Sequence, residues 1–251
     1  MRTCPVAWAL DLDGVIWLGD QPIAGSADPV ARLRAAGESV VFVTNNSSEP
    51  VGFVEAKLAR HGIPAAGDVL TSAMAAAALV DPGEVALVCA GPGVDEALAA
   101  RGVRTVREGK ADVVVVGFHR DFDYGRMVAA SAAVRGGARL LATNDDATYP
   151  TPDGLIPGGG AILAAVSTAS GVVPEVAGKP NTPMADLLRA RVGGDGVMVG
   201  DRPDTDGRFA VALGYRFGLV LSGVTTALPV VPTPDLVADD LAELVDGALA
   251  S

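Results

Sequence analysis

Short apolar runs, typical of buried β-strands, alternate with helical patterns along the 251 residues of the chain. This alternation predicts an α/β fold with a largely parallel sheet, because parallel strands must be joined by crossover connections, usually helices. Strands are expected at residues 6–10, 39–43, 68–70, 85–89, 113–116, 139–142, 196–199 and 217–221. Helices are expected at 28–37, 50–62, 73–80, 94–101, 124–135, 161–169, 183–191, 205–213 and 236–249.

Local signals indicate where some of these elements begin and where the chain divides. Asp28 is expected to cap the first helix, and Ser47 or Ser48 the second. The turn at residues 81–83, Asp-Pro-Gly, is suited to a hinge, and a second α/β set runs from there to Gly178. We therefore expect a core split in sequence, 1–78 plus 179–251, with a second domain, 79–178, inserted into it.

The first strand ends in two aspartates. Asp11 and Asp13 follow the apolar run at residues 7–10, and Gly14 comes directly after them. Alternate residues of an extended chain point to the same side, so both carboxylates start out aimed at one place. Two carboxylates this close need a shared proton, a basic side chain or a metal. Taken alone, the stretch is better explained as an Asp-Gly turn after a buried strand, which is a common feature.

Polar residues follow apolar runs at three further places in the core. The four sets are Asp11/Asp13, Thr44/Asn45/Asn46, Lys179, and Asp201 through Asp206. In an open parallel sheet, ligands bind outside the carboxyl ends of the strands, near the point where the strand order reverses. Each set by itself is typical of turn, cap or surface residues. We do not expect all four sets to lie at the same sheet edge by chance, so together they indicate a functional site.

The ordered set resembles the four signature motifs of the haloacid dehalogenase (HAD) superfamily of phosphohydrolases. More narrowly, it is similar to the NagD-like and p-nitrophenyl phosphatase-like subgroup with a large α/β cap, subclass IIA. The motifs are Asp11-Leu12-Asp13-Gly14-Val15, Thr44-Asn45-Asn46-Ser47, Lys179, and Gly200-Asp201 with Asp206, and residues 143–146 and 150–154 are also typical of the subgroup. The resemblance implies a Rossmann-like, doubly wound parallel-sheet core with an inserted α/β cap domain.

The resemblance also implies a role for each motif. Asp11 would be the nucleophile that forms an aspartyl-phosphate, and Asp13 the acid and then the base. Mg²⁺ would be held by the carboxylates of Asp11 and Asp201 and the backbone carbonyl of Asp13. Asp206 would orient these ligands or pair with Lys179.

The phosphate group would be bound by the remaining motif residues. Thr44 supplies a hydroxyl, Asn45 and Asn46 lie near a helix start that favours anions, and Lys179 supplies a point charge. The implied activity is Mg²⁺-dependent hydrolysis of a small phosphorylated metabolite: glycerol phosphate, phosphoglycolate, pyridoxal phosphate or a nucleotide monophosphate. The sequence leaves open the substrate, which of Asn144, Asp146, Tyr149 and His119 would contact it, and the oligomeric state, although capped relatives are often dimers.

Two other classes of function compete with a phosphatase. A non-hydrolytic phospho-accepting switch also gathers acidic residues, a Thr and a Lys around Mg²⁺. Asp13 opposes this alternative, because an acid/base group would speed loss of the phosphoryl group. A dinucleotide-dependent dehydrogenase is opposed by the sequence Gly91-Pro92-Gly93, where Glu96 replaces the third glycine of the fingerprint. We expect a tight strand-to-helix turn there, and a helix start at Gly158-Gly159-Gly160.

Composition restricts the partners and the compartment. The net charge of −11 argues against a nucleic-acid or anionic-membrane partner, since both attract clusters of Lys and Arg. The longest uninterrupted apolar stretch, residues 73–80, is far shorter than the ~18 residues of a membrane span. An apolar run that stops at Asp11 predicts no signal peptide. With Cys4 and Cys89 interpreted as reduced, buried thiols, we expect a cytoplasmic protein.

Overall fold

The computed structural model describes residues 6–151 and 154–250. Its internal contacts divide the chain into two compact units. The first comprises Met1–Thr44, Val54–Leu70 and Lys179–Ser251, and the second Asn45–Phe53 and Thr71–Gly178. This division has a boundary after Gly178 and includes 45–53 and 71–78 in the second unit. The assignment of the units as core and cap domains stays a prediction.

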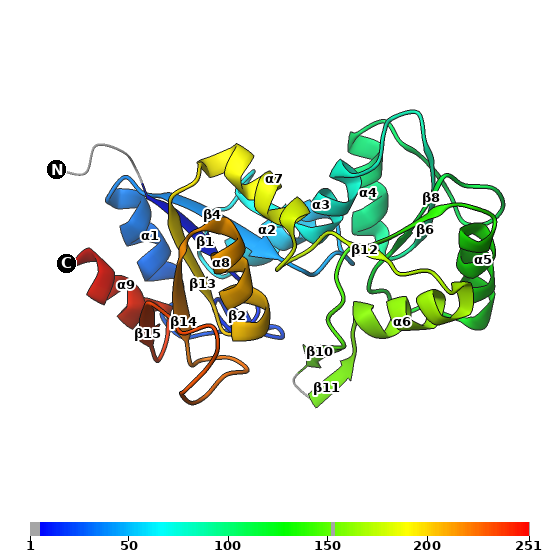
Figure 1. The fold of residues 1–251 in the computed structure, drawn as a ribbon. Coiled ribbons are helices and arrows are strands. Elements are labelled where there is room, and N and C mark those ends of the chain that lie inside the picture. The colour runs from blue at the N-terminus through cyan, green and yellow to red at the C-terminus, as the bar shows by residue number, and fades with distance from the viewer. Residues whose placement is uncertain (1–5, 152–153, 251) are drawn as a thin grey trace. The chain divides into compact units, whose positions relative to one another are not determined.

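The first unit is built on a six-stranded sheet with the order β15-β14-β13-β1-β4-β5 (Figure 1). Its strands are β1 (Ala7–Leu10), β4 (Ser39–Thr44), β5 (Val69–Thr71), β13 (Gly196–Gly200), β14 (Arg216–Val220) and β15 (Leu236–Ala238). β1 pairs in parallel with both β4 and β13, so the strand order reverses at β1. Ligands of doubly wound sheets bind outside the carboxyl ends of the strands at such a reversal.

Helices cover the sheet of the first unit on both faces (Figure 1). They are α1 (Ala27–Ala35), α7 (Thr182–Val192), α8 (Arg208–Leu213) and α9 (Leu241–Leu249), while α2 (Val51–Arg60) crosses the division between the units. α1 packs against α9, and α7 against α8. A short hairpin of β2 (Trp17–Leu18) and β3 (Gln21–Pro22) follows β1.

The second unit has its own parallel sheet, with the order β12-β9-β8-β6-β7. Its strands are β6 (Val85–Cys89), β7 (Arg104–Val106), β8 (Val113–Val116), β9 (Arg139–Ala142) and β12 (Glu175–Val176). β8 consists of four buried valines, as expected for a strand covered on both faces. An antiparallel hairpin of β10 (Thr148–Thr151) and β11 (Gly154–Pro157) extends from this unit.

The helices of the second unit form two packed pairs. They are α3 (Ser72–Ala78), α4 (Pro92–Ala100), α5 (Tyr124–Arg135) and α6 (Gly159–Ser170). α5 packs against α6 over an apolar cluster that includes Leu87, Val116 and Val166, and α3 packs against α4. Together, the two helix-covered parallel sheets confirm the predicted α/β class with a doubly wound core.

Two predicted helices near the C-terminus are wrong at their starts. Leu236–Ala238 is not helical but joins the sheet beside β14, and α9 begins after Asp240, whose carboxylate accepts from the Glu243 N–H. Residues 203–207 form a π-helical turn before α8, because the N–H groups of Thr205 to Gly207 all donate to the Arg202 carbonyl.

Both predicted helix caps are also wrong. Asp28 lies inside α1 and pairs with Arg32, while Ser26 occupies the cap position. The Ser47 hydroxyl bonds with Thr143 instead of a helix start, and Ser48 bonds with Asn46. The strand-to-helix turn predicted at Gly91-Pro92-Gly93 and the helix start predicted at Gly158-Gly159-Gly160 are confirmed, since α4 begins at Pro92 and α6 at Gly159.

Cys89 is buried and free, as expected, and Cys4 lies outside the described residues. No helix in the described ranges is both long and apolar enough to cross a membrane.

Candidate active site

Asp11 and Asp13 lie where the chain leaves the sheet at the carboxyl end of β1. All four residues of β1 are buried, so the strand is fixed in the sheet, and the Asp11 side chain accepts from the Leu12 N–H at 2.8 Å. Gly14 takes a left-handed φ of +83°, which lets the backbone turn directly after the pair. The Trp17 indole N–H donates to Asp13 Oδ1 at 3.1 Å and fixes the second carboxylate.

Lys179 is buried beside these aspartates. Only 1% of its surface is exposed, and its Nζ lies 2.9 Å from Asp11 Oδ1 and 2.8 Å from Asp206 Oδ1. Burial alone would lower the pKa of Lys179, but the two carboxylates outweigh it and raise the pKa, so the ammonium stays charged. The alternative of a solvated surface lysine is therefore excluded.

Asp201 and Asp206 follow β13 and reach the same place. Val224 N–H donates to Asp201 Oδ2 at 2.6 Å, and Arg202 N–H donates to Asp206 Oδ2 at 3.1 Å. A Cβ atom at Gly14 or Gly223 would overlap the Asp201 carboxylate. Glycines on both sides therefore leave the space that this side chain occupies.

The four aspartates form an excess of buried negative charge. Burial is the main cause that raises the pKa values of Asp11 and Asp13, of Asp206 to about 6 and of Asp201 to about 8. Lys179 offsets only part of this charge. A divalent cation would compensate the remainder and keep the carboxylates ionised at neutral pH.

The donor set fits a hard cation. One oxygen each of Asp11, Asp201 and Asp206 lies within 4.8 Å of the others. Asp201 Oδ1 is buried and has no hydrogen-bond partner within the described part of the chain. An all-oxygen set of this kind suits Mg²⁺. Asp206 is already engaged by Lys179, which agrees with the supporting role predicted for it.

The predicted phosphate-binding residues fall in both units. Thr44 is the last residue of β4, beside β1, and only 2% of it is exposed. Asn45 and Asn46 begin the second unit. There the Asn45 side chain donates to Asp146 at 2.9 Å, and the Asn46 side chain donates to the Tyr149 hydroxyl at 3.3 Å.

Sequence reasoning missed several residues that hold the site. Trp17 fixes Asp13, and Lys57 lies over the Trp17 ring at 4.2 Å from its centroid. The loop after β14 carries Val224, which bonds Asp201, and Ser222, whose hydroxyl donates to the Gly14 carbonyl at 2.7 Å. The signal was available, because this loop also leaves the carboxyl end of a parallel strand.

The close approach of Gly223 to Asp201 yields a testable prediction. We expect Gly223→Ala to displace the Asp201 carboxylate and lower kcat/KM by at least about 10-fold, with an overpacking cost of about 1–3 kcal/mol. Gly194→Ala is the matched control, because a Cβ there meets no atom within 4 Å. Steady-state kinetics and thermal unfolding of both variants check this, and equal activity in the two would refute a close fit around Asp201.

Comparisons with known proteins identify the family of the chain. Residues 8–104 match the family model of haloacid dehalogenase-like hydrolases, and residues 176–244 match a second HAD-hydrolase-like model. The chain is 35% identical over 231 residues to an acid sugar phosphatase of Staphylococcus saprophyticus, covering 88% of each protein. It is 39% identical over 228 residues to a D-glycerol 3-phosphate phosphatase of Mycobacterium tuberculosis, covering 87% of this chain but only 63% of that relative.

A solved structure extends this likeness to the fold. The glycerol phosphate phosphatase of M. tuberculosis, in complex with magnesium, superposes with a TM-score of 0.86 at 36% identity, over 95% of this chain and 75% of that one. The expectation of a HAD-type phosphatase is thus confirmed at the level of the family. With two family models matched in order and relatives similar along most of its length, the chain belongs to the haloacid dehalogenase-like hydrolases.

Proposed function

We propose that this protein is a Mg²⁺-dependent phosphomonoesterase that works through an aspartyl-phosphate on Asp11. The observation that carries the proposal is the buried Lys179, which lies between Asp11 and Asp206. A lysine in this position favours the ionised form of Asp11, against the effect of burial, and adds positive charge where a phosphoryl group would arrive. Phosphoryl transfer depends mainly on positioning and on electrostatic stabilisation, and this arrangement supplies both.

The two aspartates of the first motif divide the chemistry. Asp11 attacks phosphorus, and its carboxylate oxygen replaces the alcohol oxygen of the substrate. Asp13, fixed by Trp17, donates a proton to the departing alcohol and then accepts one from the water that hydrolyses the aspartyl-phosphate. The raised pKa of Asp13 suits a group that must carry a proton for part of the cycle. Thr44, Asn45, Asn46 and Lys179 are proposed to bind the phosphate.

Asp11, Asp201 and the backbone carbonyl of Asp13 would hold the cation, with Asp206 supporting them. When bound, Mg²⁺ supplies positive charge that offsets the carboxylates and the phosphate oxygens. Asp201 contributes its buried Oδ1, which has no hydrogen-bond partner among the described residues. The Val224 N–H keeps its other oxygen in place.

Removing the cation gives a direct test of this assignment. We expect EDTA to abolish phosphatase activity and Mg²⁺ to restore it, because the buried carboxylates are otherwise uncompensated. Asp201→Ala should raise the Mg²⁺ concentration required for half-maximal activity by more than about 10-fold. Loss of a residue that only supports a metal ligand already weakens metal binding by about 10-fold, and loss of a ligand should weaken it more. Activity that survives thorough chelation would refute the metal assignment.

The second unit is proposed to act as the cap that selects the leaving group. The substrate class is then a small phosphomonoester, such as glycerol phosphate, phosphoglycolate, pyridoxal phosphate or a nucleotide monophosphate. We further propose that the protein works in the cytoplasm, without nucleic-acid or membrane partners, and as a homodimer. The test of substrate class is a screen of these phosphomonoesters and sugar phosphates against a phosphopeptide, with Asp11→Asn as the inactive control. A preference for the phosphopeptide would contradict the proposal.

The alternative function, a phospho-accepting switch, is separated from a phosphatase by the lifetime of the phosphoryl group. A phosphatase releases phosphate in repeated turnovers, whereas a switch retains one equivalent for minutes or longer. The hydrogen bond from Trp17 to Asp13 favours the phosphatase, because a positioned acid/base group speeds hydrolysis.

A further inference from the structure

The second unit contains a cavity of about 290 Å³ at the point where its own strand order reverses. The sheet order β7-β6-β8-β9-β12 places the first strand of the unit, β6, between β7 and β8. The cavity is lined by the segments that leave the carboxyl ends of β6 and β8, residues 90–92 and 118–121, together with residues 48 and 49. In open α/β sheets this is the place where ligands bind. The predicted phosphatase chemistry uses none of its charged residues.

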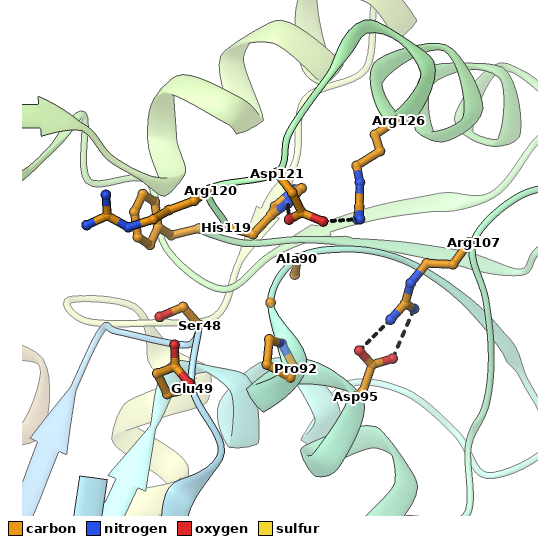
Figure 2. A pocket seen from close by; sticks show the side chains of 12 residues that line it. Ser48, Glu49, Ala90, Pro92, Asp95, Arg107, His119, Arg120, Asp121 and Arg126 are labelled. Atoms are coloured by element: carbon orange, nitrogen blue, oxygen red, sulfur yellow. Dashed lines mark hydrogen bonds and ion pairs between the residues drawn. The ribbon is translucent and has the colours of Figure 1, made fainter. Parts of the chain in front are cut away.

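Two arginines give this cavity its chemistry (Figure 2). Arg107 donates to both oxygens of Asp95, at 3.0 and 2.6 Å, and Arg126 donates to Asp121. A guanidinium has five N–H donors, so these pairs fix both groups, and further N–H donors of each have no partner among the residues that the structure describes. Figure 2 shows Arg107 and Arg126 on the same side of the cavity, whereas Arg120 extends away from them.

Asp121 is in turn tied to a buried histidine. His119 is 5% exposed, and its Nδ1 lies 2.8 Å from Asp121 Oδ1, so the imidazole N–H donates to the carboxylate. This bond, followed by Arg126, lowers the pKa of Asp121 and keeps it an acceptor for both partners. The His119–Asp121–Arg126 chain therefore holds a guanidinium in a fixed place.

The cysteine beside this cluster is not suited to act as a nucleophile. Cys89 Sγ lies 3.7 Å from His119 Nε2, which resembles a nucleophile beside a base. However, Cys89 belongs to the apolar cluster under α5 and α6, and burial raises the pKa of its thiol to about 11. The thiol stays protonated at neutral pH and is a poor nucleophile. The cluster is therefore suited to binding.

We propose that this cavity binds a small ligand through an oxyanion, a phosphate or a carboxylate, held by Arg107 and Arg126. Oriented guanidinium groups recognise such planar or tetrahedral anions with paired hydrogen bonds. A second hollow of about 200 Å³, lined by Leu87, Val88 and Cys89, shares the same two arginines and offers room for an apolar part of the ligand. A cavity of this size, at the lower end of known ligand sites, suits a small metabolite.

A ligand in the cavity would also affect Asn46, a predicted phosphate-binding residue. Ser48 lines the cavity, and both its N–H and its hydroxyl donate to Asn46 Oδ1, at 3.0 and 2.7 Å. The backbone at Ser48 and Glu49 is packed tightly against the start of α4. A Cβ atom at Gly91 or Gly93 would overlap the carbonyls of Ser48 and Glu49. A ligand that presses on Ser48 therefore acts on Asn46 as well, and this consequence rests on the proposed function.

Histidine NMR can test the binding site directly, because the chain has two histidines. His119 lies in the wall of the cavity, and His61 lies in the first unit. Protein labelled at histidine is titrated with inorganic phosphate and, separately, with malonate, at constant ionic strength set by chloride. We expect a saturable shift of the His119 ring signals with at least one of the two anions. The responding anion identifies the ligand class.

The variants decide whether the two arginines cause the shift. Arg107→Met/Arg126→Met should abolish the saturable His119 shift, whereas Arg104→Met, which removes one charge from β7, should preserve it. Thermal unfolding checks that all variants are folded. No saturable His119 shift with either anion, or a shift that persists in the double variant, would overturn the proposal. The readout needs no turnover, so it is independent of whether the protein hydrolyses phosphomonoesters, which is measured separately with p-nitrophenyl phosphate.

Discussion

Asp11→Asn is expected to abolish phosphatase turnover, with kcat reduced by at least about 10⁴-fold, since loss of a nucleophile removes the covalent route. The amide cannot attack phosphorus, and it is a poorer ligand for Mg²⁺. The fold should persist, because an amide oxygen can still accept from Lys179 and from the Leu12 N–H. Removing one of the crowded carboxylates also relieves repulsion, so the thermal stability of the metal-free protein should not fall.

The matched control for this variant is Asp204→Asn. Asp204 lies in the π-helical turn near the site, but its side chain is 65% exposed and, within the described ranges, its carboxylate pairs with Arg202 alone, at 3.5 Å. Its substitution should leave kcat within about 2-fold of the wild-type value, because exposed ion pairs contribute little free energy. Substantial turnover by Asp11→Asn, or an equal loss in the control, would contradict the assignment of Asp11.

Lys179→Met should have the second large effect, on both catalysis and stability. We expect kcat/KM to fall at least about 10²-fold, the scale for removing one contact to developing charge. The metal-free protein should also lose about 3–5 kcal/mol of unfolding free energy, because two buried carboxylates are left without their cation. Steady-state kinetics and denaturant unfolding in EDTA measure the two losses.

A double variant separates these two effects of Lys179. Lys179→Met/Asp206→Asn removes both charges of the buried pair, so much of the lost stability should return. Activity should stay low, because the positive charge beside Asp11 is still missing. If the double variant recovered activity together with stability, Lys179 would be a structural residue only.

The alternation of apolar runs and helical patterns was enough to predict the α/β class, because burial on both faces gives parallel strands their apolar sequence. It could not separate Leu236–Ala238 from the helix that follows. An apolar run of three residues fits a strand or a helix equally well. It forms a strand here because it pairs with the edge strand β14. Short pairs such as β10 and β11 depend on tertiary contacts in the same way.

The candidate site was predictable where its residues follow long strands. Asp11, Thr44 and Asp201 each come at the end of a buried run, so their meeting at one sheet edge follows from topology. The loop that carries Val224 could have been suspected, because it also leaves the carboxyl end of a strand, but the individual bonds that Trp17 and Val224 make depend on how the chain turns after each strand. The partners of Asn45 and Asn46 come from residues about a hundred positions away, which spacing alone could not identify.

The central claim is that Asp11 carries the phosphoryl group during turnover, and trapping the acyl phosphate tests it most directly. The enzyme is mixed with excess p-nitrophenyl phosphate, quenched within milliseconds and reduced with borohydride, which converts a phosphorylated aspartate to homoserine. Peptide mass spectrometry then locates the reduced residue. We predict homoserine at position 11 in the wild-type protein and none in Asp11→Asn. Reduction at another aspartate, or steady turnover with no reduced residue at position 11, would contradict the account.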